Sequence, residues 1–316
     1  MGLIMRIGIT GATGFLGSYL LRHFVEDGTH ALRALTRTIS FDVRIGSGVV
    51  QWQQGDLQSV KVCEDFVRDL EVVVHFAHTN TPLTSNRSLP SDVAANMLPA
   101  ANLLQAIKEQ GHRPHVVYAS SGGAVYGCAN EHRLFLETDE CLPGTSYGIQ
   151  KIAVEHYLRM AAEEGWLTAT CLRVGNPYGV LLPPERLQGL IGVVLNQLVH
   201  NEPVRIFGSI ENVRDYMHLK DLCRIIEAVL TPHKPFDIFN VGSGKGYSVR
   251  EVLFLIEKYS GRKLLRHFDC PESNCRHLPS WVVLDITKAK AELGWEPEIG
   301  LEQGLKELCE ESIRER

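Results

Sequence analysis

Positive charge is in short supply in this sequence. Its 316 residues carry 32 Lys and Arg against 37 Asp and Glu, which gives a formal net charge of −5. Proteins that hold phosphodiester backbones do so with an excess of Lys and Arg. The charge balance therefore argues against nucleic acid as a partner.

Long apolar runs are also missing. No stretch reaches the roughly 20 apolar residues that a membrane-spanning helix needs. The segment Met1–Ile9 has the pattern of a short strand interrupted by Arg6, and it lacks the apolar region of a signal peptide. We therefore expect no membrane partner and a cytoplasmic location.

Cysteine motifs are absent as well. The eight cysteines form no CxxC and no Cys/His cluster with zinc spacing. Scattered thiols in a chain of this size are typical of reduced cytosolic proteins rather than of disulfide frameworks. The thirteen histidines are equally dispersed, so we predict no metal site.

The sequence does contain a regular alternation of short apolar runs and helical patterns. The predicted strands are 5–10, 30–36, 49–53, 71–77, 115–120 and 168–174. The predicted helices are 15–26, 92–110, 146–164, 187–200, 220–230 and 248–260. This alternation predicts an α/β fold, a doubly wound parallel sheet of the Rossmann type with a smaller carboxy-terminal substrate-binding lobe. We expect a dinucleotide-binding domain at 1–176 and a lobe at 177–316, with some later segments returning to the first domain.

A glycine-rich loop, Gly11-Ala-Thr-Gly14-Phe-Leu-Gly17, follows the first predicted strand and opens the first helix. Small residues there let the backbone turn tightly and approach a pyrophosphate, whose charge rests on the helix amino terminus. Glycines also serve ordinary turns, but this position within a strand–helix–strand unit favours a dinucleotide site. The predicted cofactor contacts in the loop are Gly11, Thr13, Gly14, Phe15, Leu16 and Gly17.

The end of the second predicted strand decides between NAD and NADP. A carboxylate there usually binds the adenosine ribose, but this sequence reads Ala34-Leu-Thr36-Arg37. Arg37 either pairs with a 2′-phosphate, which favours NADP, or stacks on adenine or is solvated. Asp56 and Leu57, after the third strand, are candidate adenine contacts. The cofactor is thus NAD or NADP, with Arg37 favouring NADP.

Tyr147 and Lys151 lie four residues apart at the start of a predicted helix, so their side chains share one face. A phenol with a pKa of about 10 is a poor base at neutral pH, and lowering the pKa by about three units takes roughly 4 kcal/mol. A desolvated site holding Lys151 and an oxidised nicotinamide supplies positive charge for this purpose. The pair is therefore the predicted catalytic centre.

Together these motifs make the chain resemble the extended short-chain dehydrogenase/reductase family of nucleotide-sugar epimerases and dehydratases. Further matching segments are Val74–Ala77, Tyr118–Gly127, Arg173–Gly179, Val213–His218 and Asn240–Gly244. The resemblance runs over nearly the whole chain and favours the 4-epimerase branch. It implies a homodimer that acts on a nucleotide-diphosphate sugar.

The resemblance also implies roles for individual residues. Tyr147 is the base on the sugar 4-hydroxyl, and Lys151 binds the nicotinamide ribose. Further implied cofactor contacts are Phe76, Ala77 and Asn96, and the implied substrate contacts are Asn176, Arg214, Arg276 and Ser121. For Arg214 the alternative is a salt bridge with Asp215.

One departure concerns the hydroxyl that normally assists the tyrosine. The family places a serine or threonine where this chain has Gly122, so Ser121 is the nearest substitute, although strand alternation can turn it away. Gly122, Gly123 and Ala124 also offer none of the carboxyl groups that dehydratases and decarboxylases carry there. Hydride chemistry without elimination remains, which favours a 4-epimerase. The alternatives are an NADP-dependent reductase or dehydrogenase of a keto-sugar nucleotide and a non-catalytic dinucleotide sensor.

Overall fold

In the computed structural model, residues 4–38, 50–128, 132–183, 185–186, 188–268 and 279–314 are described. Their centre is a seven-stranded sheet in which every neighbouring pair is parallel. Its order across the sheet is β11 (Phe236–Val241), β7 (Thr168–Val174), β5 (His115–Ser121), β4 (Val72–His75), β1 (Arg6–Thr10), β2 (Ala31–Thr36) and β3 (Val50–Gln54). The strand order reverses direction beside β1, which confirms the doubly wound prediction.

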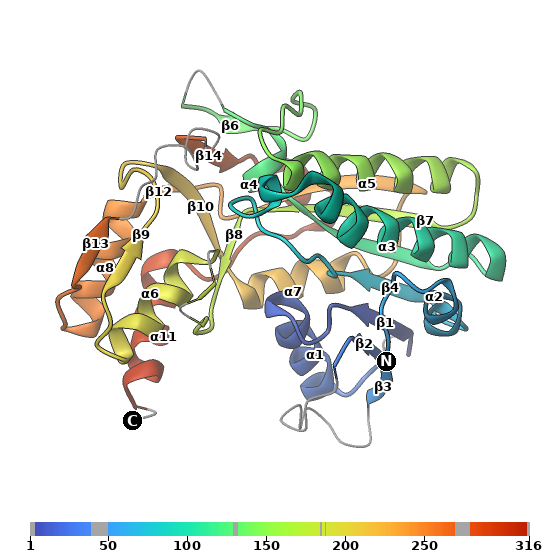
Figure 1. Ribbon diagram of the computed structural model, residues 1–316, viewed down its shortest axis with the longest axis horizontal. Coiled ribbons are helices and arrows are strands. Elements are labelled where there is room, and N and C mark those ends of the chain that lie inside the picture. The colour runs from blue at the N-terminus through green and yellow to red at the C-terminus, as the bar shows by residue number, and fades with distance from the viewer. Residues whose placement is uncertain are drawn as a thin grey trace.

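Helices cover both faces of this sheet (Figure 1). On one face, α1 (Phe15–Asp27) and α7 (Leu219–Ala228) pack a core that includes Phe24 and Ile226. On the other, α2 (Val60–Val67), α3 (Leu89–Gln110) and α5 (Ser146–Glu163) pack a second core around Phe66 and Leu158. Burial on both faces explains why the strands read as nearly continuous apolar runs.

The lobe is built on smaller sheets. One runs β12 (Gly246–Ser248), β10 (Val213–His218), β14 (Trp281–Leu284) and β6 (Leu134–Phe135), with β8 (Asn176–Tyr178) also paired to β10. A second pairs β13 (Arg266–Phe268) with β9 (Val204–Ile206). Helices α6 (Leu190–Val199), α8 (Val249–Ser260) and α11 (Leu301–Arg314) pack with them, at the left of Figure 1. The short helices are α4 (Gly122–Val125), α10 (Thr287–Leu293) and the 3₁₀ turn η1 (Ser85–Arg87).

Most predicted elements agree with these bounds, and the differences have local causes. Helix α3 begins three residues before the prediction because Ser88 occupies its N-cap position and Pro90 fits its first turn. Strand β4 ends at His75, two residues early, because the chain then leaves the sheet. Helix α2, which the pattern missed, is only eight residues long.

In the part of the chain that the structure describes, no helix combines the length and apolarity that a membrane span needs.

Candidate active site

A cavity of about 1040 Å³ lies at the carboxyl ends of the parallel strands, between the main sheet and the lobe. The loops that follow β1, β2, β3, β4 and β5 line one side of it, and residues 174–178, 185–186, 188–191 and Tyr216 line the other. Ligands of open α/β sheets bind in this crevice, where the strand order reverses.

The glycine loop forms the floor of one end of the cavity. Gly11 has a φ of 66°, which a side chain would strain. A Cβ on Gly17 would lie 2.2 Å from the Gly11 carbonyl oxygen, so the helix can start this close to the strand only with glycine. Helix α1 has no side-chain cap and no acid in its first turn. Its free N–H groups therefore suit a diphosphate, and the loop fits a dinucleotide cofactor.

The other predicted cofactor contacts of this end, with one exception, line the same cavity: Thr13, Gly14, Phe15, Leu16, Arg37, Asp56, Leu57, Phe76 and Ala77. Arg37 is exposed at the end of β2. Phe76 and Ala77 reach the cavity because the chain leaves β4 there, where the Ala77 N–H donates to Thr10 Oγ1 over 3.2 Å.

The exception is Asn96, which is not among the lining residues. It is buried behind the wall, where its Oδ1 accepts a hydrogen bond of 2.7 Å from the Thr79 N–H. Its Nδ2 donates to the Asp92 carbonyl over 2.9 Å. Asn96 thus holds the loop that forms the wall of the cavity.

Tyr147 and Lys151 project from the first turns of α5, which Thr145 caps by accepting from the Gly148 N–H over 3.2 Å. Both side chains are buried and both line the cavity. Lys151 Nζ lies 5.4 Å from the centroid of the Tyr147 ring and donates to the Ala119 carbonyl over 2.8 Å. Burial lowers the pKa of Lys151 to about 7, against the nearby charge of Glu155, which raises it.

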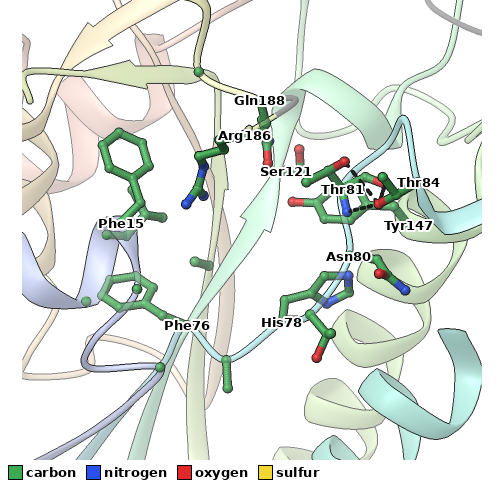
Figure 2. A pocket seen from close by; sticks show the side chains of 18 of the residues that line it. Phe15, Phe76, His78, Asn80, Thr81, Thr84, Ser121, Tyr147, Arg186 and Gln188 are labelled. Carbon is green, nitrogen blue, oxygen red and sulfur yellow. Dashed lines mark hydrogen bonds between the residues drawn. The ribbon is translucent and has the colours of Figure 1, made fainter. Parts of the chain in front are cut away.

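Ser121, whose orientation the sequence left open, faces Tyr147 (Figure 2). Burial raises the pKa of Tyr147, whereas a hydrogen bond with Ser121 and the positive charge of Arg186 lower it. A Cβ at Gly122 would lie 2.6 Å from Leu284 Cδ1 and 2.9 Å from the Arg173 carbonyl oxygen. The packing therefore leaves no room for a hydroxyl side chain at position 122, and Ser121 presents one instead.

Of the predicted substrate residues in the lobe, one lines the cavity and another does not. Asn176 lines the cavity, and its Nδ2 donates to the Asp215 carbonyl over 3.3 Å. Arg214 is not among the described lining residues, and its Nη1 donates to the Val213 carbonyl over 2.8 Å. The structure records no Arg214–Asp215 ion pair within its described part; the Asp215 carboxylate accepts from Ser243, Gly244 and Leu284. Arg276 lies outside the described residues.

Two residues that line the cavity, His78 and Arg186, were not predicted from the sequence. The ring of His78 meets that of Tyr147 edge-on at 4.7 Å between centroids, and burial lowers its pKa to about 2, so it is neutral. Arg186 comes from a proline-containing loop after β8 and reaches toward Phe15 (Figure 2). No motif marks either residue, so only the path of the chain reveals them.

Helix α5 is also held by Asp92, a fully buried residue of α3. Its carboxylate accepts from Ser146 Oγ over 2.6 Å, from Asn96 Nδ2 over 3.1 Å, and from the side chains of Gln150 and Asn80. These bonds join α3, the start of α5 and the loop after β4. The network therefore fixes the catalytic turn relative to the cavity wall.

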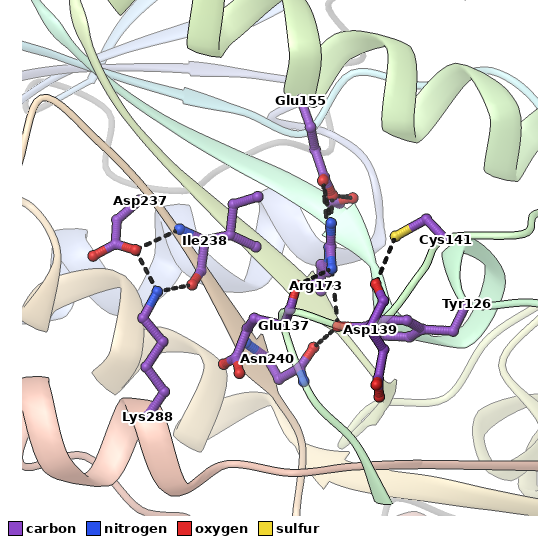
Figure 3. Close-up of polar contacts among 11 residues, drawn as sticks. Tyr126, Glu137, Asp139, Cys141, Glu155, Arg173, Asp237, Ile238, Asn240 and Lys288 are labelled. Carbon is purple, nitrogen blue, oxygen red and sulfur yellow. Dashed lines mark hydrogen bonds and ion pairs between the residues drawn. The ribbon is translucent and has the colours of Figure 1, made fainter.

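One turn after Lys151, Glu155 forms a buried ion pair with Arg173 of β7 (Figure 3). Arg173 Nη2 donates to Glu155 Oε2 over 2.7 Å and its Nε to Oε1 over 3.1 Å. Arg173 also donates to the Tyr126 hydroxyl over 3.0 Å, and Ser120 Oγ donates to Glu155. The pair thus connects α5 to β5, β7 and the end of α4.

Comparison with known proteins places this site in a family. A model described as the NAD dependent epimerase/dehydratase family matches residues 7–242. The chain is 32% identical to dTDP-4-dehydro-6-deoxyglucose reductase of Escherichia coli, over 97% of this chain and 96% of that protein. It is 28% identical to a putative UDP-glucose 4-epimerase of Methanocaldococcus jannaschii, over 95% and 96%. The crystal structure of Thermus thermophilus UDP-glucose 4-epimerase in complex with NAD superposes with a TM-score of 0.88 at 27% identity, over 98% of this chain and 99% of that one.

These similarities extend over nearly the whole chain, including all the segments that form the site. They confirm the resemblance drawn from the motifs. They give no support to NADP as the cofactor, because the dinucleotide named with the Thermus thermophilus structure is NAD. This chain belongs to the NAD dependent epimerase/dehydratase family.

Proposed function

We propose that this protein is a 4-epimerase of a nucleotide-diphosphate sugar. The observation that carries the proposal is the buried Tyr147, which faces Ser121 and lines the same cavity as Lys151 and the glycine loop (Figure 2). A phenol in that position can take a proton from a sugar hydroxyl and later return it.

The chain's own residues then have distinct tasks. Ser121 orients the reacting hydroxyl beside Tyr147, and Lys151, anchored on the Ala119 carbonyl, is placed to contact the nicotinamide ribose. When bound, nicotinamide supplies the hydride acceptor and donor. The 4-keto sugar would turn over within the cavity and accept hydride on its other face, so no net oxidation occurs. Asn176, on the lobe side, would bind the sugar.

The positions of the acidic residues in the cavity favour epimerisation over elimination, because neither of them lies in the segment that faces Tyr147. Among its described lining residues, only Asp56 and Glu185 are acidic. Asp56 follows β3 at the adenosine end, and Glu185 is exposed on the lobe. Neither acid belongs to the segment at the end of β5 that carries Ser121 and faces Tyr147. Elimination of water from the sugar needs a carboxyl group there.

A reductase of a 4-keto-sugar nucleotide is the second candidate. Two observations favour it: the 32% identity to the Escherichia coli dTDP-4-dehydro-6-deoxyglucose reductase, and the exposed Arg37, which is free to pair with a 2′-phosphate. A reductase releases its oxidised cofactor in each cycle, whereas an epimerase keeps it. Mass spectrometry of the small molecules released by denaturation separates the two: stoichiometric NAD supports the epimerase, and an empty protein that oxidises added NADPH with a 4-keto sugar supports the reductase.

Tyr147→Phe tests the shared chemistry. Loss of the phenol removes the general base, so we expect kcat on UDP-hexoses to fall by at least about 100-fold with little change in melting temperature. Tyr259→Phe is the matched control, because Tyr259 lies on α8 of the lobe and is not among the residues that line the cavity. Normal turnover by the Tyr147→Phe protein would refute the proposal.

We also propose a homodimer through α3 and α5. Both helices carry large apolar side chains that are exposed in the single chain: Leu89, Val93, Leu98, Ile149, Tyr157 and Met160. Exposed apolar groups on adjacent helices favour an interface. Sedimentation equilibrium would show twice the chain mass, and a Val93→Glu protein would sediment as a monomer.

A further inference from the structure

Arg186 enters the cavity from the lobe, between β8 and α6, and its side chain extends into the space between Phe15 and Tyr147 (Figure 2). Its guanidinium carbon lies 5.3 Å from the centroid of the Phe15 ring. Its Nε is buried and has no hydrogen-bond partner among the described residues. This arginine thus lies between the glycine-loop end and the catalytic end of the cavity.

The half-buried Arg186 guanidinium has no anionic partner within the described chain. Burial lowers the pKa of Arg186, which shows that its surroundings disfavour the charge. Within the described chain, Asp56 and Glu185 are the acids of the cavity wall, and neither forms an ion pair with Arg186. Buried charges in proteins are normally paired or bind a ligand. Arg186 is only half-buried, but it lines the cavity without an anionic partner, so an anion bound in the cavity would suit its charge.

The neighbourhood indicates which anion fits. Phe15 is the first residue of α1, whose first turn has neither an acid nor a side-chain cap. The free N–H groups of that turn and the Arg186 guanidinium therefore approach the same part of the cavity from opposite sides. A guanidinium fork and a helix amino terminus both match a phosphate group with several anionic oxygens.

We propose that Arg186 binds a diphosphate group from the lobe side of the cavity, opposite the glycine loop. Two diphosphates can reach it, that of the dinucleotide and that of the sugar nucleotide, and contact with Phe15 favours the first. The second source rests on the proposed function. In both cases Arg186 connects the lobe to a ligand held by the main sheet, so occupancy of the cavity draws the two parts together.

The test is calorimetric titration of the parent and of Arg186→Gln, both freed of retained cofactor beforehand, with NAD and, separately, with UDP. Loss of a charge-assisted hydrogen bond to phosphate predicts affinity weaker by about 10- to 100-fold for the diphosphate that Arg186 contacts. Arg186→Lys keeps the charge but not the fork, so it should weaken binding less. Arg22→Gln is the matched control, since Arg22 is exposed on α1 and lies outside the cavity.

The outcomes separate the sources. Weaker NAD binding with unchanged UDP binding assigns Arg186 to the cofactor diphosphate, and the reverse assigns it to the substrate diphosphate. Unchanged affinity for both ligands, in a variant with the circular dichroism of the parent, overturns the proposal. These titrations need no turnover, so a protein that fails to epimerise any sugar nucleotide still gives a clear answer about Arg186.

Discussion

Helix α5 is held at two places by buried carboxylates, and the two are built differently. At its first turn, Asp92 is surrounded by neutral donors from Ser146, Gln150, Asn80 and Asn96. Two turns further, Glu155 faces the guanidinium of Arg173. Tyr147 and Lys151 lie on the segment between them.

The difference shows how the start of α5 can be held in place by a carboxylate that does not change the charge of Lys151. Hydroxyl and amide donors, together with the positive end of the helix dipole, stabilise Asp92 without a cation. Glu155 needs the full charge of Arg173 because it lies in the middle of the helix, away from the dipole's positive end. Only Glu155 acts on the charge of Lys151, raising its pKa against the effect of burial. Asp92 thus acts on position, and Glu155 acts on charge.

The largest effect should come from Glu155→Gln. The change removes one charge and leaves Arg173 buried and unpaired, which costs about 3–5 kcal/mol of unfolding free energy. Urea denaturation measures it. Adding Arg173→Met to the same protein should recover most of the loss, and failure to recover it would show that the ion pair is not the cause.

Lys151→Met should change stability in the opposite direction. Folding lowers the pKa of this lysine from 10.5 to about 7, so the unfolded chain binds more protons between these values and stability rises with pH across that window. The penalty is fully present below pH 7 and vanishes near pH 10.5. We expect the variant to be about 2–4 kcal/mol more stable at pH 7, after allowance for the lost bond to Ala119, and inactive. Urea midpoints that differ from the parent by the same amount at pH 7 and pH 10 would refute this.

Asp92→Asn should have the smallest effect on stability. The Gln150 Oε1 atom has no partner among the described residues, so the Gln150 amide can turn over and accept from the new amide group. We expect a loss of about 1 kcal/mol. Because the network positions the catalytic turn, kcat should fall more than KM changes. Asp92→Ala, which removes the acceptor that four side chains share, is the sharper control and should cost more than Asp92→Asn.

The sequence by itself determined the elements that depend on local geometry. The glycine loop follows from the torsion and space that only glycine allows at Gly11 and Gly17. The face shared by Tyr147 and Lys151 follows from helical spacing, and the parallel sheet follows from the alternation of strands and helices. Each of these patterns involves residues that are close in the sequence or that repeat at a regular spacing, so the sequence alone reveals it.

Only the tertiary structure decided what lies between distant segments. Asp92 meets Ser146 across 54 positions of sequence, and Arg186 approaches Phe15 from the lobe. The exclusion of a side chain at position 122 depends on how Leu284 and the Arg173 backbone pack around Gly122. Asn96 turned away from the cavity to bond the Thr79 backbone. These contacts depend on how loops cross and on which side chains exclude one another, and no spacing along the chain encodes them.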